Sequence, residues 1–153
     1  REYGIDPLER HFVEEVMTTE VRTIDASTPV GQALAEHFGP GQLHRAFPVV
    51  RDGALVGMAD RAFLVAHKAM DPMAPVGNAC EPPPAACLGE SCRSLATRMA
   101  RLHVERLPVV RDLESRELVG IVARSDLIKP SLAHFDEEEK RERMRGLPWQ
   151  AGA

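Results

Sequence analysis

Apolar and polar residues follow a pattern that predicts paired strands and then a helix, most clearly between residues 106 and 128. Two β-branched runs, 107–110 and 118–122, flank a polar segment, and Asp126 follows the second run. Such runs are typical of two antiparallel strands joined by a hairpin loop, with the carboxylate in the first turn of the next helix. Gly120 interrupts the second run, and an isolated glycine in a strand often marks a close approach to the backbone. We therefore expect Gly120 to form one wall of a shallow site.

A similar pattern occurs earlier in the chain. The aligned segments are 17–30 with 79–92, and FPVVRDGALVGM at 47–58 with LPVVRDLESRELVGIV at 107–122. The alignment pairs Gly57 with Gly120, and a tight Asp52-Gly53 turn in the first copy corresponds to a longer hairpin loop in the second. The chain is therefore interpreted as a tandem duplication.

Each copy is predicted to contain a strand, a helix, two further strands and a second helix. In the first copy the expected strands are 21–24, 46–50 and 55–59, and the closing helix is 61–70. Thr28 is expected to cap the first helix, with Pro29 at its first position. The apolar face of that helix is predicted to comprise Val30, Leu34 and Phe38.

Three consecutive prolines change the prediction for the second copy. The run at 82–84 cannot donate backbone hydrogen bonds, so the first strand is expected to be a short edge strand. Ser91 is expected to cap the following helix, whose buried face is predicted to comprise Leu95, Met99 and Leu102.

The repeats divide the chain into five segments and predict its fold class. The segments are an N-terminal linker at 1–15, a first repeat at 16–70, an inter-repeat linker at 71–78, a second repeat at 79–130 and a charged C-terminal helix and tail at 131–153. In that helix Glu137 faces Arg141, and Glu139 faces Arg143, at the i,i+4 spacing. The repeated order predicts an α/β protein of the α+β kind, with two tandem βαββα units.

Composition narrows the function classes. A hydrophobic content of 44% is enough for a core, and a formal net charge of −4 argues against non-specific binding to nucleic acid or anionic lipid. Three cysteines match no zinc spacing and are too few for a disulfide framework, which favours free thiols in a reducing cytosol. The six histidines are spread along the chain, and the sequence contains no nucleophile-elbow, phosphate-loop or metalloprotease motif. We therefore expect a cytoplasmic binding module with no catalytic residue, no metal ligand and no required cofactor.

The duplicated unit resembles the CBS domain, and the two copies together resemble the CBS pair, or Bateman module. The residues that carry the resemblance are LPVV, LVGIV and Asp126 in the second copy and FPVVRDGALVGM in the first, within roughly 16–128. The resemblance implies two βαββα units packed about a pseudo-twofold axis. It also implies clefts that bind AMP, ADP, ATP or S-adenosylmethionine as a regulatory ligand, and assembly as a homodimer.

The ligand pattern of the family transfers to one copy better than to the other. In the family, a Thr or Ser three residues after the strand glycine and an Asp six residues after it hold the ribose, and the second copy has Ala123 and Asp126 there. The first copy has Asp60 and Phe63, so the resemblance implies that any site lies in the second copy. The other walls implied for that site are Arg124, Ala85, Ala86, Leu107 and Pro108. Asp126 has an alternative role as a helix-start residue that accepts backbone hydrogen bonds.

The flanks of the repeats resemble those of a CBS pair in a membrane protein. Residues 3–17 and 125–145 are similar to the cytoplasmic tail of bacterial ClC-type chloride channels and transporters. This resemblance implies a covalent membrane transport domain in the full-length protein and a position at the cytoplasmic face of the inner membrane. The first residue is Arg, which fits a piece of a longer protein. The alternatives are a stand-alone CBS-pair protein and a structural dimerisation module that binds no nucleotide.

Overall fold

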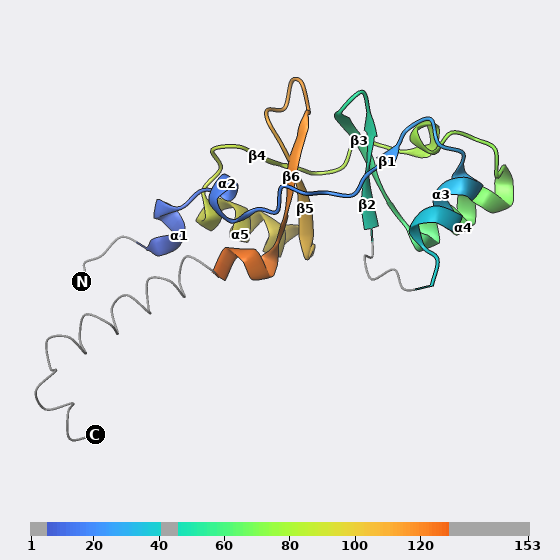
Figure 1. Cartoon of the computed structure of the whole chain (residues 1–153). Helices are drawn as coiled ribbons and strands as arrows, with labels where there is room; N and C mark the ends of the chain where they lie inside the picture. The colour runs from blue at the N-terminus through green and yellow to red at the C-terminus, as the bar shows by residue number, and fades with distance from the viewer. Residues whose placement is uncertain (1–5, 41–45, 129–153) are drawn as a thin grey trace, which may run out of the picture. The chain divides into compact units, whose positions relative to one another are not determined.

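Figure 1 shows the computed structural model, which describes residues 6–40 and 46–128. The chain divides into a larger unit, Thr18–Cys87 with Pro108–Ile121, and a smaller unit, Arg1–Met17 with Leu88–Leu107 and Val122–Ala153. Helices and two three-stranded sheets, in the orders β1-β2-β3 and β4-β5-β6, give the mixed α and β class that the sequence predicts. The charged helix predicted at 131–153 lies outside the described residues.

The first sheet belongs to the first repeat and lies in the larger unit. β1 (Ile24–Asp25) runs parallel to β2 (Ala46–Arg51), and β2 pairs antiparallel with β3 (Ala54–Asp60). Asp52 and Gly53 connect β2 to β3 with φ angles of 52° and 83°, the left-handed values that a tight two-residue turn requires. The predicted hairpin and its turn are therefore confirmed.

The first strand is shorter than predicted and starts later. The sequence places it at 21–24, but only Ile24 and Asp25 pair with β2. The preceding chain is held by the second repeat instead: Thr18 N–H donates to the Ile121 carbonyl, and Ile121 N–H donates to the Thr18 carbonyl, both at 2.9 Å. Residues 21–23 connect these two attachments and therefore pair with neither strand.

Two helices pack next to the first sheet. α3 (Val30–His37) and α4 (Arg61–Met70) lie side by side (Figure 1), and α4 has the predicted bounds. The Asp60 side chain caps α4 by accepting a hydrogen bond from Phe63 N–H at 2.8 Å. The predicted cap of α3 is wrong: Pro29 takes the cap position in place of Thr28 and offers no side-chain hydrogen bond.

The core of the larger unit confirms most of the predicted apolar face of α3. Val30 and Phe38 are buried, Leu34 is only partly buried, and Ala33 completes the face. The core comprises Ile24, Ala26, Val30, Ala33, Phe38, Phe47, Val49, Ala59, Leu64 and Val76.

The segment predicted as an inter-repeat linker, 71–78, packs against α3. The first backbone N–H groups of an α-helix have no partner inside the helix. Those of α3 donate to the carbonyls of Pro72 and Ala74, both at 2.9 Å. Val76, which begins the 3-10 helix η1 (Val76–Ala79), is fully buried. The segment therefore closes the N-terminus of α3 as well as linking the repeats.

The second sheet comprises β4 (Ala86–Cys87), β5 (Arg106–Val110) and β6 (Leu118–Ala123). β4 pairs in parallel with β5 and is a two-residue edge strand, as the preceding prolines predict. The loop from β5 to β6 is closed by an ion pair, with Arg111 Nε 2.9 Å from Glu117 Oε1.

The described part of the smaller unit is mainly helical and also contains one end of β5 and one end of β6. Its helices are α1 (Pro7–Arg10), α2 (Val13–Val16), α5 (Cys92–Leu102) and the 3-10 helix η2 (Arg124–Ile128). Ser91 caps α5 as predicted, by accepting a hydrogen bond from Ser94 N–H at 3.1 Å. The buried residues of α5 are Cys92, Leu95 and Met99. The prediction for Leu102 is wrong: it is 41% exposed, because α5 ends there and His103 turns the chain with a φ of 56°.

The predicted N-terminal linker, 1–15, packs against α5 where the structure describes it. Cys92 N–H donates to the His11 carbonyl at 2.9 Å, and Val13 is fully buried. Residues 6–17 therefore close the N-terminus of α5, in the same way that the inter-repeat linker closes the N-terminus of α3.

Candidate functional site

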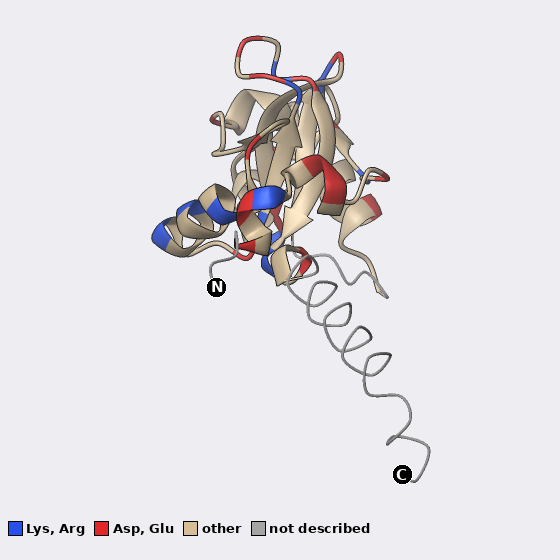
Figure 2. Cartoon of the chain, turned by 90° about the vertical axis from the view of Figure 1, so that its left-hand side faces the viewer, with Lys and Arg blue, Asp and Glu red and all other residues tan. Residues whose placement is uncertain are grey.

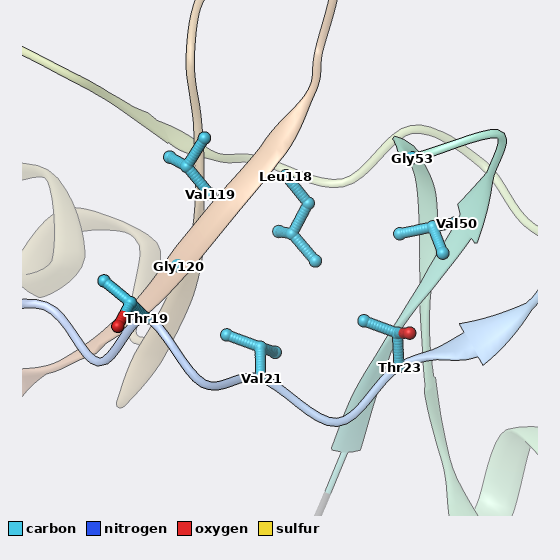
Figure 3. Close-up of a pocket in the computed structure, with 8 residues that line it drawn as sticks. All are labelled: Thr19, Val21, Thr23, Val50, Gly53, Leu118, Val119 and Gly120. Carbon is cyan, nitrogen blue, oxygen red and sulfur yellow. The ribbon is translucent and has the colours of Figure 1, made fainter.

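A pocket of about 230 Å³ lies in the larger unit, between residues of the two repeats (Figure 3). Its walls come from the extended chain before β1, the β2–β3 hairpin and the start of β6. The lining residues are Thr19, Val21, Thr23, Val50, Gly53, Leu118, Val119 and Gly120. Gly120 is therefore one wall of a pocket, as its place inside a strand predicts.

Backbone hydrogen bonds between the repeats position these walls. The paired Thr18 and Ile121 precede Thr19 and follow Gly120 in the chain, which fixes one end of the pocket. Near the other end, Leu118 N–H donates to the Gly53 carbonyl at 3.0 Å. The pocket thus lies between two backbone attachments, and both exist because the repeats pair with each other here.

The pocket has apolar walls and few polar groups. Figure 3 shows Val21, Val50 and Leu118 pointing toward the middle of the group. Thr19 and Thr23 add hydroxyl groups, each able to donate and to accept a hydrogen bond. None of the lining residues is ionisable, so the pocket offers no general acid, base or charged nucleophile. Its chemistry suits an uncharged flat ring with nitrogen or oxygen atoms at the edge.

The size of the pocket limits what it encloses. Sites for small organic ligands usually measure about 300–1,000 Å³. At about 230 Å³ this pocket is smaller, so it can enclose one ring system and leave the rest of a larger ligand outside.

The hairpin loops carry both basic and acidic residues (Figure 2). In the β5–β6 loop the Arg111 guanidinium lowers the pKa of Glu117, and Glu117 in turn raises the pKa of Arg111. The Ser115 backbone N–H and side chain lower the pKa of Asp112 in the same loop. These carboxylates stay ionised near neutral pH, so the loop has mixed charge while the pocket is neutral.

The seven residues predicted as ligand contacts are divided between the two units. Asp126, Ala123, Arg124 and Leu107 belong to the smaller unit, and Ala85, Ala86 and Pro108 belong to the larger unit. None of the seven is among the residues that line the pocket of Figure 3.

Asp126 lies in the first turn of the short helix η2. Its carboxylate accepts a hydrogen bond from Ala123 N–H at 2.9 Å, which is the helix-start role that the sequence left open. Arg124 Nη1 lies 3.0 Å from Glu105 Oε2 in an exposed ion pair. Exposed pairs contribute about 1 kcal/mol or less, so a phosphate can compete with Glu105 for this guanidinium.

The predicted apolar walls are largely core residues. Ala85 packs in a buried cluster with Leu55 and Val110, and Ala86 is fully buried beside Val109 in the β4–β5 pair. Leu107 and Pro108 are buried as well. The side chains of these residues stabilise the fold.

The sequence analysis missed the three lining residues before β1. Thr19, Val21 and Thr23 alternate along an extended segment, and alternate residues of extended chain share one face. This alternation, together with the glycine in the strand at 118–122, was the sequence signal that these three residues form one wall of a pocket.

The first repeat treats the equivalent positions differently. Gly57, the counterpart of Gly120, lies against Cys80: a Cβ on Gly57 would lie 2.3 Å from the Cys80 Cβ. Asp60 is occupied as the cap of α4, and Phe63 packs against the core of the larger unit. The space beside the strand glycine is therefore filled in this repeat.

Other kinds of site were considered for the described ranges 6–40 and 46–128. No group of three or more His, Cys, Asp or Glu residues able to hold a metal ion occurs there, and the three cysteines form no disulfide bond. No helix within these ranges is long and apolar enough to cross a membrane.

Comparison with known proteins identifies the family. Residues 13–62 and 76–132 each match the CBS domain family. The fold is similar to that of CBSX2 in complex with AMP, with 24% identity and a TM-score of 0.63 over 80% of this chain and 97% of that chain. It is also similar to the CBS domain of the bacterial CNNM/CorC family Mg²⁺ transporter in complex with ATP, with 24% identity and a TM-score of 0.63 over 80% and 88%.

A third similar structure is an uncharacterized conserved protein from Pyrococcus horikoshii, with 26% identity and a TM-score of 0.64 over 82% of this chain and 55% of that chain. No curated protein matches the chain. The two matched segments together span more than half of the sequence, and each overlaps one of the two aligned copies. The chain therefore belongs to the CBS domain family, with one CBS domain in each repeat.

Proposed function

We propose that the chain is a regulatory CBS pair that senses an adenine nucleotide in the cytoplasm and catalyses no reaction. The pocket of Figure 3 carries this proposal, because its apolar walls and two threonine hydroxyls suit the flat ring of adenine. Two proteins of similar fold, CBSX2 and the CBS domain of the CNNM/CorC transporter, are in complex with AMP and ATP. A neutral pocket without ionisable side chains supports binding and gives no support to catalysis.

Two residues of the smaller unit are proposed separately, from the family pattern, as nucleotide contacts. Asp126 and Arg124 lie in the same short helix, η2. A carboxylate suits a ribose hydroxyl, and a guanidinium suits a phosphate. We expect nucleotide binding to require Asp126 in the second repeat and to be unaffected by the loss of Phe63 in the first.

Thermal melts with AMP, ADP, ATP and S-adenosylmethionine test the proposal. A ligand at about 100 times its Kd stabilises a protein by about 2.7 kcal/mol, which is a rise of about 5–10 °C for a chain of this size. Val21→Asp places a charge in the neutral pocket and should remove the rise, and Asp126→Ala should weaken binding about 10- to 100-fold. Phe63→Ala is the control and should keep the rise.

Two results would count against nucleotide sensing. No rise with any of the four ligands would leave the chain as a structural dimerisation module. A rise that survives both Val21→Asp and Asp126→Ala but disappears with Phe63→Ala would move the site to the first repeat.

The assembly proposed for the module is a homodimer. α4 exposes Val65 and Met70, and Met73 follows in the next segment; these side chains are 49%, 80% and 72% exposed. Grouped exposed apolar side chains often mark an interface. Light scattering should give twice the chain mass of 16.9 kDa at micromolar concentration. A mass of one chain, with or without nucleotide, would reject the dimer.

The partner proposed for the module is a covalently attached transport domain of the ClC chloride channel type. The similarity of the flanking segments supports it, and a CBS domain of the CNNM/CorC transporter shows that such modules occur in transport proteins. The full-length gene product should then contain several apolar runs of about 20 residues. A gene product without such runs would favour a stand-alone CBS-pair protein.

A further inference from the structure

A second pocket in the larger unit, of about 410 Å³, is bordered by two arginines. It lies beside the first repeat, where β3, the segment before β4 and the β5–β6 loop meet. Its lining residues are Arg51, Ala54, Leu55, Val56, Gly77, Cys80, Pro82, Glu114, Ser115 and Arg116. Unlike the pocket of Figure 3, it has ionisable side chains, and its volume falls in the usual range for small organic ligands.

Arg116 is fixed at the edge of this pocket. Its backbone has a φ of 54°, and its carbonyl accepts a hydrogen bond from Leu55 N–H at 2.8 Å. Its side chain donates from Nη2 to the Pro83 carbonyl at 2.9 Å and more weakly from Nε to the Leu55 carbonyl at 3.4 Å. A guanidinium has five N–H donors, so about three remain for a ligand.

Arg51 supplies the second guanidinium. A Cβ on Gly77 would lie 2.9 Å from Arg51 Nη2, so the guanidinium lies directly against the Gly77 backbone. Within the described part of the chain no acceptor forms a hydrogen bond with this side chain, which leaves its donors available. Arg51 and Arg116 therefore give two positive charges, and the single acidic lining residue is Glu114.

The remaining walls do not cancel this charge. Burial raises the pKa of the Cys80 thiol, and Arg51 opposes this effect only in part, so the thiol is neutral at pH 7. Glu117 of the same loop is paired with Arg111. Leu55, Val56 and Pro82 add apolar surface. The lining residues therefore carry a net charge of about +1 in a chain with a formal net charge of −4. Asp25, whose pKa is lowered by Ser27 and to a smaller extent by Arg51, lies near Arg51 but does not line the pocket.

The geometry points to a binding site for a small phosphomonoester in this pocket, with the phosphate held by Arg51 and Arg116 and its carbon part against Leu55, Val56 and Pro82. Arginine binds phosphate through paired N–H groups, and two guanidiniums at one pocket match the two negative charges of a phosphomonoester. This inference does not depend on nucleotide binding in the pocket of Figure 3, because the two pockets share no lining residue.

Calorimetric titration with three probes tests the inference: inorganic phosphate, ribose 5-phosphate and adenosine. Wild type should bind the two phosphates, with an affinity that falls as salt rises. Arg51→Gln should weaken phosphate binding about 10-fold or more. Lys68→Gln is the control, because it removes one positive charge from the exposed side of α4 outside the pocket and should change binding less than about 2-fold. Glu114→Gln removes the acidic wall and should strengthen binding.

The probes separate this site from the adenine pocket. Adenosine binding should be lost in Val21→Asp and kept in Arg51→Gln, and ribose 5-phosphate should show the reverse. The inference is overturned if wild type binds neither phosphate, if Arg51→Gln and Lys68→Gln weaken phosphate binding equally, or if Val21→Asp alone removes it. A failure with adenosine alone would count against nucleotide sensing and leave the phosphate site standing. Melts of each variant would verify that it is folded.

Discussion

The two repeats share a sequence pattern, but the surroundings of its central glycine differ between them. Gly120 of the second repeat lines a pocket, whereas Gly57 of the first repeat lies under Cys80. The difference comes from the chain that passes each glycine: Thr18 and its neighbours beside Gly120, and the aligned Cys80 beside Gly57. The repeated strand motif is therefore not enough to form a site, because a residue from another segment can fill the space beside the glycine.

The segment that precedes each repeat packs against the other repeat. The segment before the second repeat closes the N-terminus of α3 in the first, through the Pro72 and Ala74 carbonyls. The segment before the first repeat closes the N-terminus of α5 in the second, through the His11 carbonyl. Each helix start is thus completed by chain from outside its own repeat, which makes neither repeat complete by itself.

The largest expected effect comes from adding a methyl group to the covered glycine. In Gly57→Ala the new Cβ would lie 2.3 Å from the Cys80 Cβ and 2.4 Å from its Sγ, so the backbone must move. We expect a loss of about 3 kcal/mol in the free energy of unfolding, the upper part of the range for overpacking. Gly120→Ala, at the glycine that lines the pocket, should cost less than about 1 kcal/mol. Urea unfolding of both variants measures the contrast, and equal losses would show that the two glycines have equivalent surroundings.

The next effect tests the packing of the segments that precede the two repeats. Val13 and Val76 are both fully buried in segments that the sequence assigned to linkers. Val13→Ala and Val76→Ala should each cost about 2 kcal/mol, because each removes buried methyl groups and leaves a cavity. Denaturant midpoints measure both losses, with Leu113→Ala in the exposed β5–β6 loop as the control. If either segment is a free linker, its variant will match the control.

A smaller effect compares the two carboxylates at the helix starts. Asp60 accepts a hydrogen bond from Phe63 N–H, and Asp126 accepts one from Ala123 N–H. Asp60→Ala and Asp126→Ala should each cost about 1 kcal/mol, or about 2–4 °C in Tm, through the lost bond. Only Asp126→Ala should also lower the gain in Tm that a nucleotide produces. Loss of that gain in Asp60→Ala instead would reverse the roles of the repeats.

The smallest effect concerns acid. The Leu8 backbone N–H and then the Arg93 guanidinium lower the pKa of Asp6 below its usual value of 3.8. The folded-state pKa is the lower one, so this stabilisation is present above pH 3.8 and is lost as the pH falls through the folded value. The Tm of wild type should exceed that of Asp6→Asn at pH 7, and the difference should shrink at pH 3. A constant difference, or one that Glu9→Gln reproduces, would exclude this attachment of the N-terminal segment.

The sequence predicted the parts of the fold that depend on local chemistry. The Asp52-Gly53 turn, the Ser91 cap and the bounds of α4 follow from residues within a few positions of one another. The packing of the leading segments was not predictable in this way, because the contacts of Pro72 and His11 with the helix N-termini are made by backbone carbonyls, which carry no sequence pattern. The prediction that Leu102 is buried was wrong because hydrophobic periodicity does not show where a helix ends.

The candidate site was predictable in one of its walls. Gly120 was indicated by its place in a strand, but its partners Thr19 and Thr23 lie far away in the chain. They became recognisable only when the Thr18 and Ile121 backbones paired. The filled counterpart in the first repeat depends on the Cys80 side chain, and no property of the motif around Gly57 reveals it.

The most direct test of the account is a methyl NMR titration with AMP. Val21, Val50, Leu118 and Val119 line the pocket of Figure 3, and Leu55 and Val56 line the arginine-bordered pocket. If the chain senses adenine nucleotides through the open side of Gly120, AMP and adenosine should both shift the methyl resonances of the first group, and ribose 5-phosphate should not. Shifts from AMP that are confined to Leu55 and Val56, with none from adenosine, would contradict an adenine site in the second repeat.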